Sequence, residues 1–223
     1  MFDNQSVVSR SAESVLATNK VLRNTYMMLS MTLVFSALMA AVSMSINVPP
    51  GASMVTSLLA IGLLWFVLPR TANTSAGVFV VFAFTGLLGF GLGPMLNNYL
   101  ALSNGSELIM TALGGTGVIF LGLSGYALTT RKDFSFLGGM MFIGLLVVLM
   151  MMIANIFLAI PALSLTISAA VIFIMSGLIL FDTSRIINGG ETNYLLATAA
   201  LYLDIYNIFV HLLSLLGALS GDD

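Results

Sequence analysis

The sequence predicts an all-α membrane protein with seven transmembrane helices. Hydrophobic residues make up 59% of the 223 residues and charged residues only 7%, whereas soluble domains carry about 25% charged residues. Mean hydropathy is +1.07. The apolar residues are collected in seven runs, most of them close to the roughly 20 residues that a helix needs to cross a bilayer.

The runs are separated by short stretches of polar and turn-forming residues. Their approximate bounds are 25–46, 53–69, 76–98, 107–129, 135–157, 163–184 and 194–217. None of the connections is long enough for a soluble domain. We therefore expect a cytoplasmic N-terminal tail at 1–24, a transmembrane domain at 25–217, and a short acidic outer tail at 218–223.

Basic residues indicate how the chain is oriented. With seven crossings, all of them fall on one side of the membrane: Arg10, Lys20, Arg23, Arg70, Arg131, Lys132 and Arg185. The connections on the other side have none. Because lysine and arginine concentrate in cytoplasmic loops, the sequence predicts a cytoplasmic N-terminus and an outer C-terminus.

The last run carries polar residues that identify its helix as the expected centre of the bundle. Four of them follow each other at spacings of three or four residues: Asp204, Asn207, His211 and Ser214. At these spacings they form a polar seam along one face of a helix. An aspartate in mid-membrane costs about 2.5–3.5 kcal/mol on insertion scales, so the seam should face protein or water. We therefore expect the last helix to be central.

A second aspartate, Asp182, lies near the inner end of the sixth run. A short loop joins the last two helices, so they should be neighbours, and Asp182 and Asp204 are candidates for a proton-sensing or gating pair. Two carboxylates that close cannot both ionise at low cost, and they titrate as a unit. Arg70 and Arg185, on the same side, are candidate counter-ions. The alternative is two separate residues, with Asp182 hydrated at the interface and Asp204 protonated and hydrogen-bonded.

Glycines are concentrated in the third and fourth runs. They stand at Gly86, Gly89, Gly91, Gly93, Gly114, Gly115, Gly117, Gly122 and Gly125. Small residues let helix backbones approach closely in a bilayer, so we expect close helix contacts along both runs.

Several segments resemble those of one known protein family. They are Phe181-Asp182-Thr183, residues 189–194 and residues 201–209 near the C-terminus, with residues 20–26, 129–133 and 135–139 earlier in the chain. The first three resemble the C-terminal signature of the Bax inhibitor-1 (TMBIM) family. The other three resemble the YccA-like bacterial branch of that family. The likeness extends from about Lys20 to Gly217.

The resemblance implies a multi-pass protein of the bacterial inner membrane in which six helices surround the last. Family members that leak calcium use paired aspartates and an arginine, which implies roles for Asp182, Asp204 and Arg70 and implies Ca²⁺ as the permeant ion. The YccA-like branch is associated instead with the membrane protease FtsH. A regulator of FtsH in membrane-protein quality control is therefore the favoured function, and a pH-sensitive calcium or cation leak is the alternative.

Enzyme chemistry is disfavoured. Residues 122–125 resemble the serine motif of rhomboid proteases, but the predicted helices place Ser124 and His211 about 15 Å apart along the membrane normal, where about 3 Å is needed. Presenilin-like proteases have glycines before their second aspartate, whereas residues 201–203 before Asp204 are bulky. With no cysteine and one histidine, thiolate and multi-histidine metal sites are excluded. We expect no cofactor, metal or nucleic-acid partner.

Overall fold

The computed structural model describes the backbone of residues 4–220 and the side chains of residues 20–220. Its elements are α1 (Asn4–Ser45), α2 (Pro50–Gly62), η1 (Leu63–Val67), α3 (Leu68–Thr71), α4 (Ala76–Leu100), α5 (Gly105–Thr130), α6 (Ser135–Leu158), α7 (Pro161–Ile187) and α8 (Tyr194–Ser220). This part of the chain contains seven helical stretches long and apolar enough to cross a membrane. The predicted all-α architecture is therefore confirmed.

The second crossing, Pro50–Thr71, combines α2, the π-helical turn η1 and α3. The π turn comes just before Pro69. A proline lacks the backbone N–H and clashes with the carbonyl four residues earlier, so a regular α-helix is disrupted there. In the wider turn the N–H of Leu68 bonds to the carbonyl of Leu63, and the helix continues past the proline.

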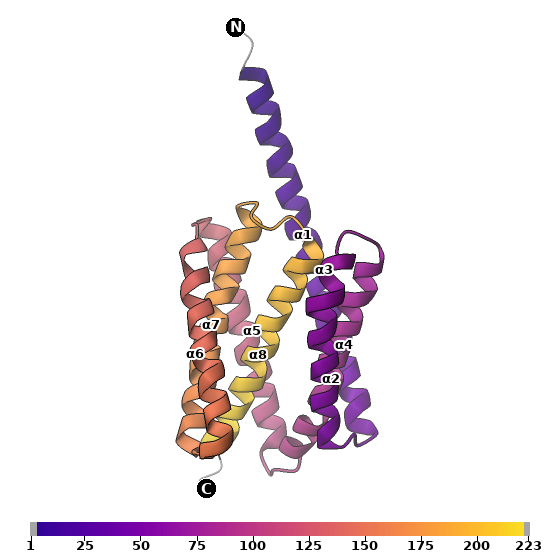
Figure 1. Ribbon diagram of the computed structural model, residues 1–223, viewed down its shortest axis with the longest axis vertical. Coiled ribbons are helices and arrows are strands. Elements are labelled where there is room, and N and C mark those ends of the chain that lie inside the picture. Colours follow the sequence, from indigo (N-terminus) through magenta and orange to yellow (C-terminus); the bar gives the residue numbers. More distant parts are fainter. Residues whose placement is uncertain (1–3, 221–223) are drawn as a thin grey trace.

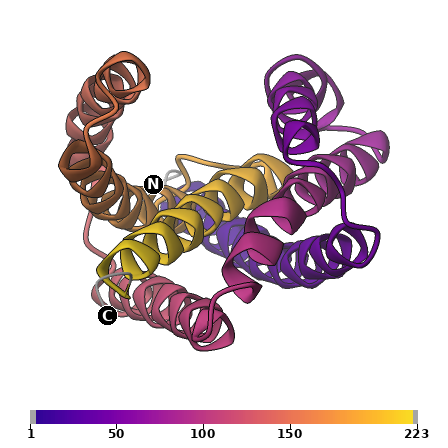
Figure 2. The ribbon, with the colours of Figure 1, turned by 90° about the horizontal axis from the view of Figure 1, so that it is seen from below.

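Helix α8 is central, as predicted, and it packs against α1, α4, α5 and α7. Helix α2 packs mainly on α4, and α6 packs on α7, so these two form an outer layer. Figures 1 and 2 show α8 crossing the molecule at a slant between the α6–α7 group and the α2–α4 group. Four of the six other helices thus make the main contacts with α8 in the described part of the chain.

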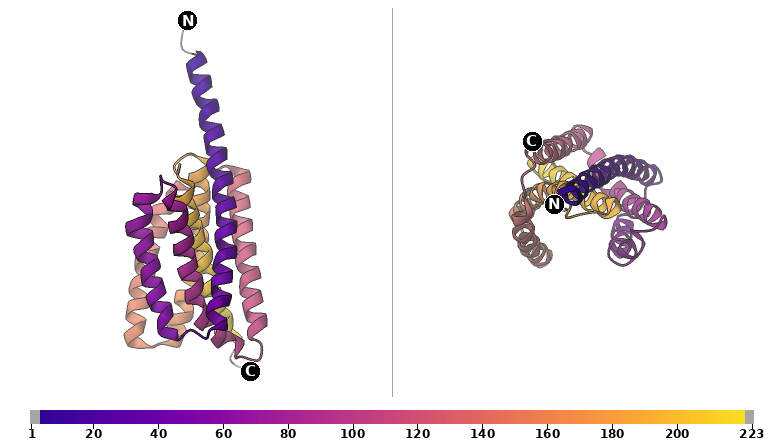
Figure 3. Two further views of the ribbon diagram at one scale, coloured as in Figure 1. Left: turned by 90° about the vertical axis from the view of Figure 1, so that its right-hand side faces the viewer. Right: turned by 90° about the horizontal axis from the view of Figure 1, so that it is seen from above.

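One end of the bundle carries the basic residues whose side chains are described. They are Lys20, Arg23, Arg70, Arg131, Lys132 and Arg185, and we call this the basic end; it is at the top of Figure 1. Helix α1 starts at Asn4 and continues without a break into the bundle. Within the predicted tail, residues 4–19 therefore extend the first transmembrane helix beyond the basic end (Figure 3).

The glycines of α4 and α5 differ in their surroundings. On α4, Gly89 lies against Ser36 of α1, and Gly93 lies against Ser43 of α1. A Cβ atom added at either glycine would collide with the serine that faces it. Most glycines of α5 have no neighbouring atom within 4 Å of an added Cβ: Gly114, Gly117, Gly122 and Gly125. The prediction of close contacts is correct for α4 and wrong for most of α5, where these positions lie on the outside of the bundle or beside an open groove.

Tyr202 fixes α8 against its neighbours. The side chain is 1% exposed, and its hydroxyl lies 2.5 Å from Oγ of Ser36 on α1. The same hydroxyl donates to the carbonyl of Thr85 on α4 at 3.1 Å. Its ring packs edge-to-face on Phe84, with the centroids 5.6 Å apart. These contacts set the rotation of α8 and hence the direction of Asp204, two residues later.

Candidate functional site at the contact of α7 and α8

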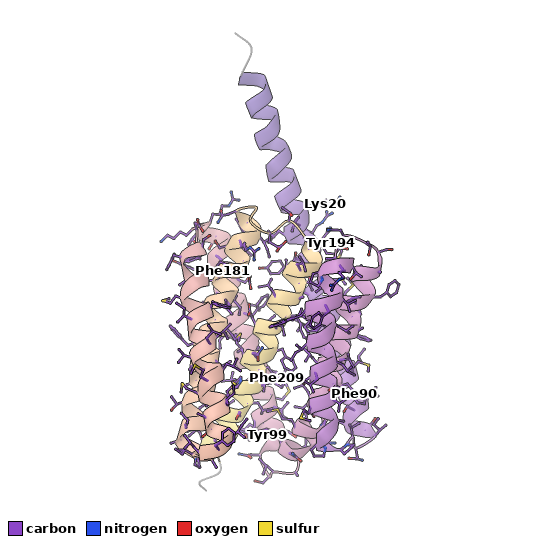
Figure 4. The ribbon with its side chains drawn as sticks, in the orientation of Figure 1. Lys20, Phe90, Tyr99, Phe181, Tyr194 and Phe209 are labelled. Atoms are coloured by element: carbon purple, nitrogen blue, oxygen red, sulfur yellow. The ribbon has the colours of Figure 1, made fainter. Side chains whose placement is uncertain are left out.

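The two aspartates face each other across the contact of α7 and α8. The carboxyl group of Asp182 acts electrostatically on that of Asp204, so the two groups lie close together. Asp204 is 3% exposed, whereas Asp182 is half-buried and lies closer to the basic end. In Figure 4, Phe181, which precedes Asp182, and Tyr194, which begins α8, both lie toward that end. The structure therefore brings together the two acids that the sequence singled out.

Asp204 lies in an apolar environment. Its neighbours along α8, Leu201 and Ile208, are fully buried. One carboxyl oxygen, Oδ2, is buried and has no hydrogen-bond partner within residues 20–220. A buried carboxylate oxygen without a donor is costly. The arrangement can therefore hold a proton between the two carboxyls, or accept a water or a cation that reaches Oδ2.

Two hydroxyl residues follow Asp182 and anchor its helix. Oγ1 of Thr183 lies 3.4 Å from Oγ of Ser124 on α5, which also bonds to the hydroxyl of Tyr26 on α1. Ser184 accepts a hydrogen bond from the backbone N–H of Phe134 at 3.0 Å. Sequence reasoning did not assign these positioning residues. Their signal was present, since small polar residues directly after a membrane aspartate are expected to hydrogen-bond between helices.

The two candidate counter-ions have different environments. Arg185 lies one turn after Asp182, acts on it electrostatically, and forms an ion pair with Glu191 at 3.5 Å. Its guanidinium also donates from Nε to the carbonyl of Gly190. Arg70 is exposed and donates to the carbonyl of Phe66 within its own helical crossing. The structure thus places Arg185, but not Arg70, beside the acid pair.

The rest of the polar seam is divided among separate partners. Asn207 donates to the carbonyl of Leu203 on its own helix at 2.8 Å. Nδ1 of His211 lies 3.2 Å from Oγ of Ser168 on α7. Ser214 lies near the side chain of Tyr99 of α4, which is at the end opposite the basic end (Figure 4). The seam is therefore a series of local contacts and not one continuous hydrogen-bonded line.

The serine and histidine of the disfavoured protease hypothesis have separate partners. Ser124 bonds to Tyr26 and Thr183 in the half nearer the basic end, whereas His211 bonds to Ser168 toward the opposite end. In the described part of the chain, no three histidine, aspartate or glutamate side chains gather as a metal site would require. The geometry instead places two carboxyl groups between two helices, close enough for the charge of one to act on the other.

These features define a class: a seven-helix membrane protein whose central helix presents a buried acid to an acid on the preceding helix. The chain belongs to the Bax inhibitor-1 family, since residues 18–221 match the family described as inhibitor of apoptosis-promoting Bax1. It is 54% identical over 215 residues to the modulator of FtsH protease YccA of Escherichia coli, covering 96% of this chain and 97% of that protein. It is also 50% identical over 213 residues to an uncharacterized membrane protein of Vibrio cholerae, covering 96% of each.

The comparisons confirm the resemblance to the YccA-like branch. A second Escherichia coli relative, also 54% identical, is the inner membrane protein YccA. Together with the seven crossings, this confirms that the chain is a multi-pass protein of the inner membrane. The names of the family and of the relatives describe an inhibitor and a modulator, which are terms for a regulator rather than for an enzyme.

Proposed function

We propose that the chain modulates the membrane protease FtsH in membrane-protein quality control. The observation that carries this proposal is the 54% identity, over nearly the full length of both chains, with the modulator of FtsH protease YccA. That identity extends over nearly the whole of both chains, and a common partner is the simplest explanation of so close a likeness.

Helix α1 supports the proposal because it provides a segment that a membrane-anchored protease could engage. Residues 4–19 extend the helix beyond the basic end, away from the other helices (Figures 1 and 3). If the basic end is cytoplasmic, as the positive-inside rule predicts, this extension projects into the cytoplasm. The extension is accessible without any separation of the transmembrane helices.

Co-purification tests the proposed partnership. The chain, tagged at its C-terminus, is extracted from Escherichia coli membranes in mild detergent, and the FtsH recovered with it is quantified by mass spectrometry. A tagged multi-pass protein of another family, produced at the same level, is the control. We expect FtsH to be enriched at least tenfold over the control, and recovery at the control level would contradict the proposal.

The contact of Asp182 with Asp204 favours a second candidate function, a pH-sensitive cation leak with Ca²⁺ as one permeant ion. The pair joins two transmembrane helices near the basic end, and Oδ2 of Asp204 has no donor among the described residues. Loss of the shared proton would place two like charges between the helices and favour their separation. Such a leak and a role in regulating FtsH could coexist in one molecule.

A further inference from the structure

The end of the molecule opposite the basic end has a recess between α6, α7 and α8. Its deeper part has a volume of about 340 Å³ and its outer part about 560 Å³. The two parts share Asn155, Ser164 and Ser214, so they form one continuous depression. His211 and Ser168 line only the deeper part. We call the whole depression the outer recess.

The lining of the outer recess is unusually polar for this protein. It collects an amide, three hydroxyls and an imidazole from three helices: Asn155, Ser164, Ser168, His211 and Ser214. Apolar side chains, such as Ile156 and Ile167, complete the lining. The groove between α1 and α5 and the recess beside Phe35 and Phe82 have a still smaller polar share. The outer recess therefore offers more hydrogen-bonding groups than either of these cavities.

The side chains of the outer recess use only part of their hydrogen-bonding capacity on each other. Asn155 donates to Oγ of Ser164 at 2.7 Å. Within residues 20–220, Nδ1 is the only nitrogen of His211 that has a hydrogen-bond partner, which is Ser168. Nε2 of His211 is not among the fully buried atoms without a partner, and the His211 side chain lines the deeper part of the recess. The imidazole therefore presents a free donor or acceptor to whatever fills the recess.

We propose that the outer recess is a water-filled vestibule that is open to the outer aqueous phase and ends at His211. Polar groups facing hydrocarbon without partners cost about 1–3 kcal/mol each, and water supplies the missing partners. The volume accommodates several waters at about 30 Å³ each. Seven residues of α8, about 10 Å, separate His211 from Asp204, so the vestibule stops short of the acid pair. This proposal depends on neither function proposed above.

The absence of native cysteine gives a direct test, because every introduced cysteine is the only thiol in the chain. Single variants Ser214→Cys and His211→Cys are produced in right-side-out membranes and treated with a charged, membrane-impermeant methanethiosulfonate. Ala169→Cys is the matched control, because Ala169 is exposed on α7 beside Ser168 but does not line the recess. Labelling after denaturation in detergent measures the total thiol present in each sample.

We expect Ser214→Cys and His211→Cys to react from the outside at least tenfold faster than Ala169→Cys. Ser214→Cys keeps the test decisive if replacement of the histidine disturbs folding. Reaction at the rate of the Ala169→Cys control would overturn the vestibule, and so would reaction that requires the reagent on the inner side.

Discussion

Asp182 and Asp204 meet although their positions along the chain suggest different depths. Asp182 lies five residues before the end of α7 and Asp204 ten residues after the start of α8, or about 7 Å and 15 Å of helix. The slant of α8 across the bundle (Figure 1) reduces the depth that its ten residues span. The hydroxyl of Thr183 ties α7 to α5, and the hydroxyl of Tyr202 ties α8 to α1.

Asp182→Asn and Asp204→Asn should each remove most of the pH dependence of any cation flux. With one shared proton, a neutral carboxyl donates to its charged partner and holds α7 against α8. Raising the pH removes that proton and leaves two like charges in a poorly hydrated place, so flux through the wild type should rise with pH. The measurement is calcium entry into dye-loaded liposomes between about pH 5 and pH 8.

Asp133→Asn and His211→Gln are the controls for this titration. Hydrogen bonds from the hydroxyl and the backbone amide of Ser135 lower the pKa of Asp133, so this exposed acid stays ionised across the tested range. Both controls should keep the pH dependence, and the double aspartate variant should resemble the single ones because the pair acts as one unit. If the flux through the wild type does not change with pH, the pair is not a gate. The same follows if both asparagine variants keep the wild-type pH dependence of the flux.

At the residue scale, the sequence identified both acids of the site but not what positions them. A charged residue inside an apolar run is costly, so it stands out without any knowledge of the fold. The partners of Asp182 and Arg70 depend on helix rotation and slant, which apolar composition does not encode. Arg70 therefore looked equivalent to Arg185, yet it bonds to its own crossing while Arg185 lies beside Asp182.

At the scale of elements, the contact of α1 with α4 depends on glycine. Gly89→Ala should destabilise the protein by about 1–3 kcal/mol, because the added methyl group meets the backbone of Ser36, which cannot easily move. Gly122→Ala on α5 is the matched control, since its methyl group would meet no atom within 4 Å. Thermal unfolding in detergent should show a lower Tm for Gly89→Ala only. Equal Tm values for the two variants would contradict close packing of α1 on α4.

The extension of α1 gives a prediction for the cell. If residues 4–19 are the segment that FtsH engages, deletion of residues 2–18 should lengthen the half-life of the protein at least severalfold. The measurement is a chase after synthesis is stopped, in cells with and without FtsH. In the control variant, a flexible linker of equal length replaces residues 2–18. This variant separates the effect of shortening the chain from the loss of this particular segment. A half-life that is unchanged by the deletion in both strains would argue against this role.

The number and bounds of the helices could be predicted from the sequence better than the contacts between the helices. Seven apolar runs give seven crossings because the bilayer sets the length of each helix. The π turn before Pro69 and the continuous helix from Asn4 were not foreseen, because the first is a local adjustment of hydrogen bonds and the second lies in polar residues. Glycine content failed as a guide in α5, since a glycine facing lipid looks the same in sequence as one at a helix contact.

At the scale of the whole molecule, the orientation follows from the basic end. Reporter fusions within residues 1–24, 70–76, 130–134 and 185–193 should all report the cytoplasm, and a fusion after Asp223 should report the outside. The physical reason is that cytoplasmic loops retain lysine and arginine, and every described one lies at the basic end. A cytoplasmic signal from the C-terminal fusion would contradict the orientation and would also remove the outer recess from the outside.

The central claim is that this chain changes the activity of FtsH, and co-reconstitution tests it most directly. Purified FtsH and one of its membrane substrates are placed in liposomes with ATP, and substrate decay is followed with and without the chain. A multi-pass protein of another family at the same ratio is the control. We predict that the wild-type chain slows decay severalfold and that deletion of residues 2–18 weakens the effect. Decay at the control rate, with the chain shown to be folded and inserted, would contradict the claim.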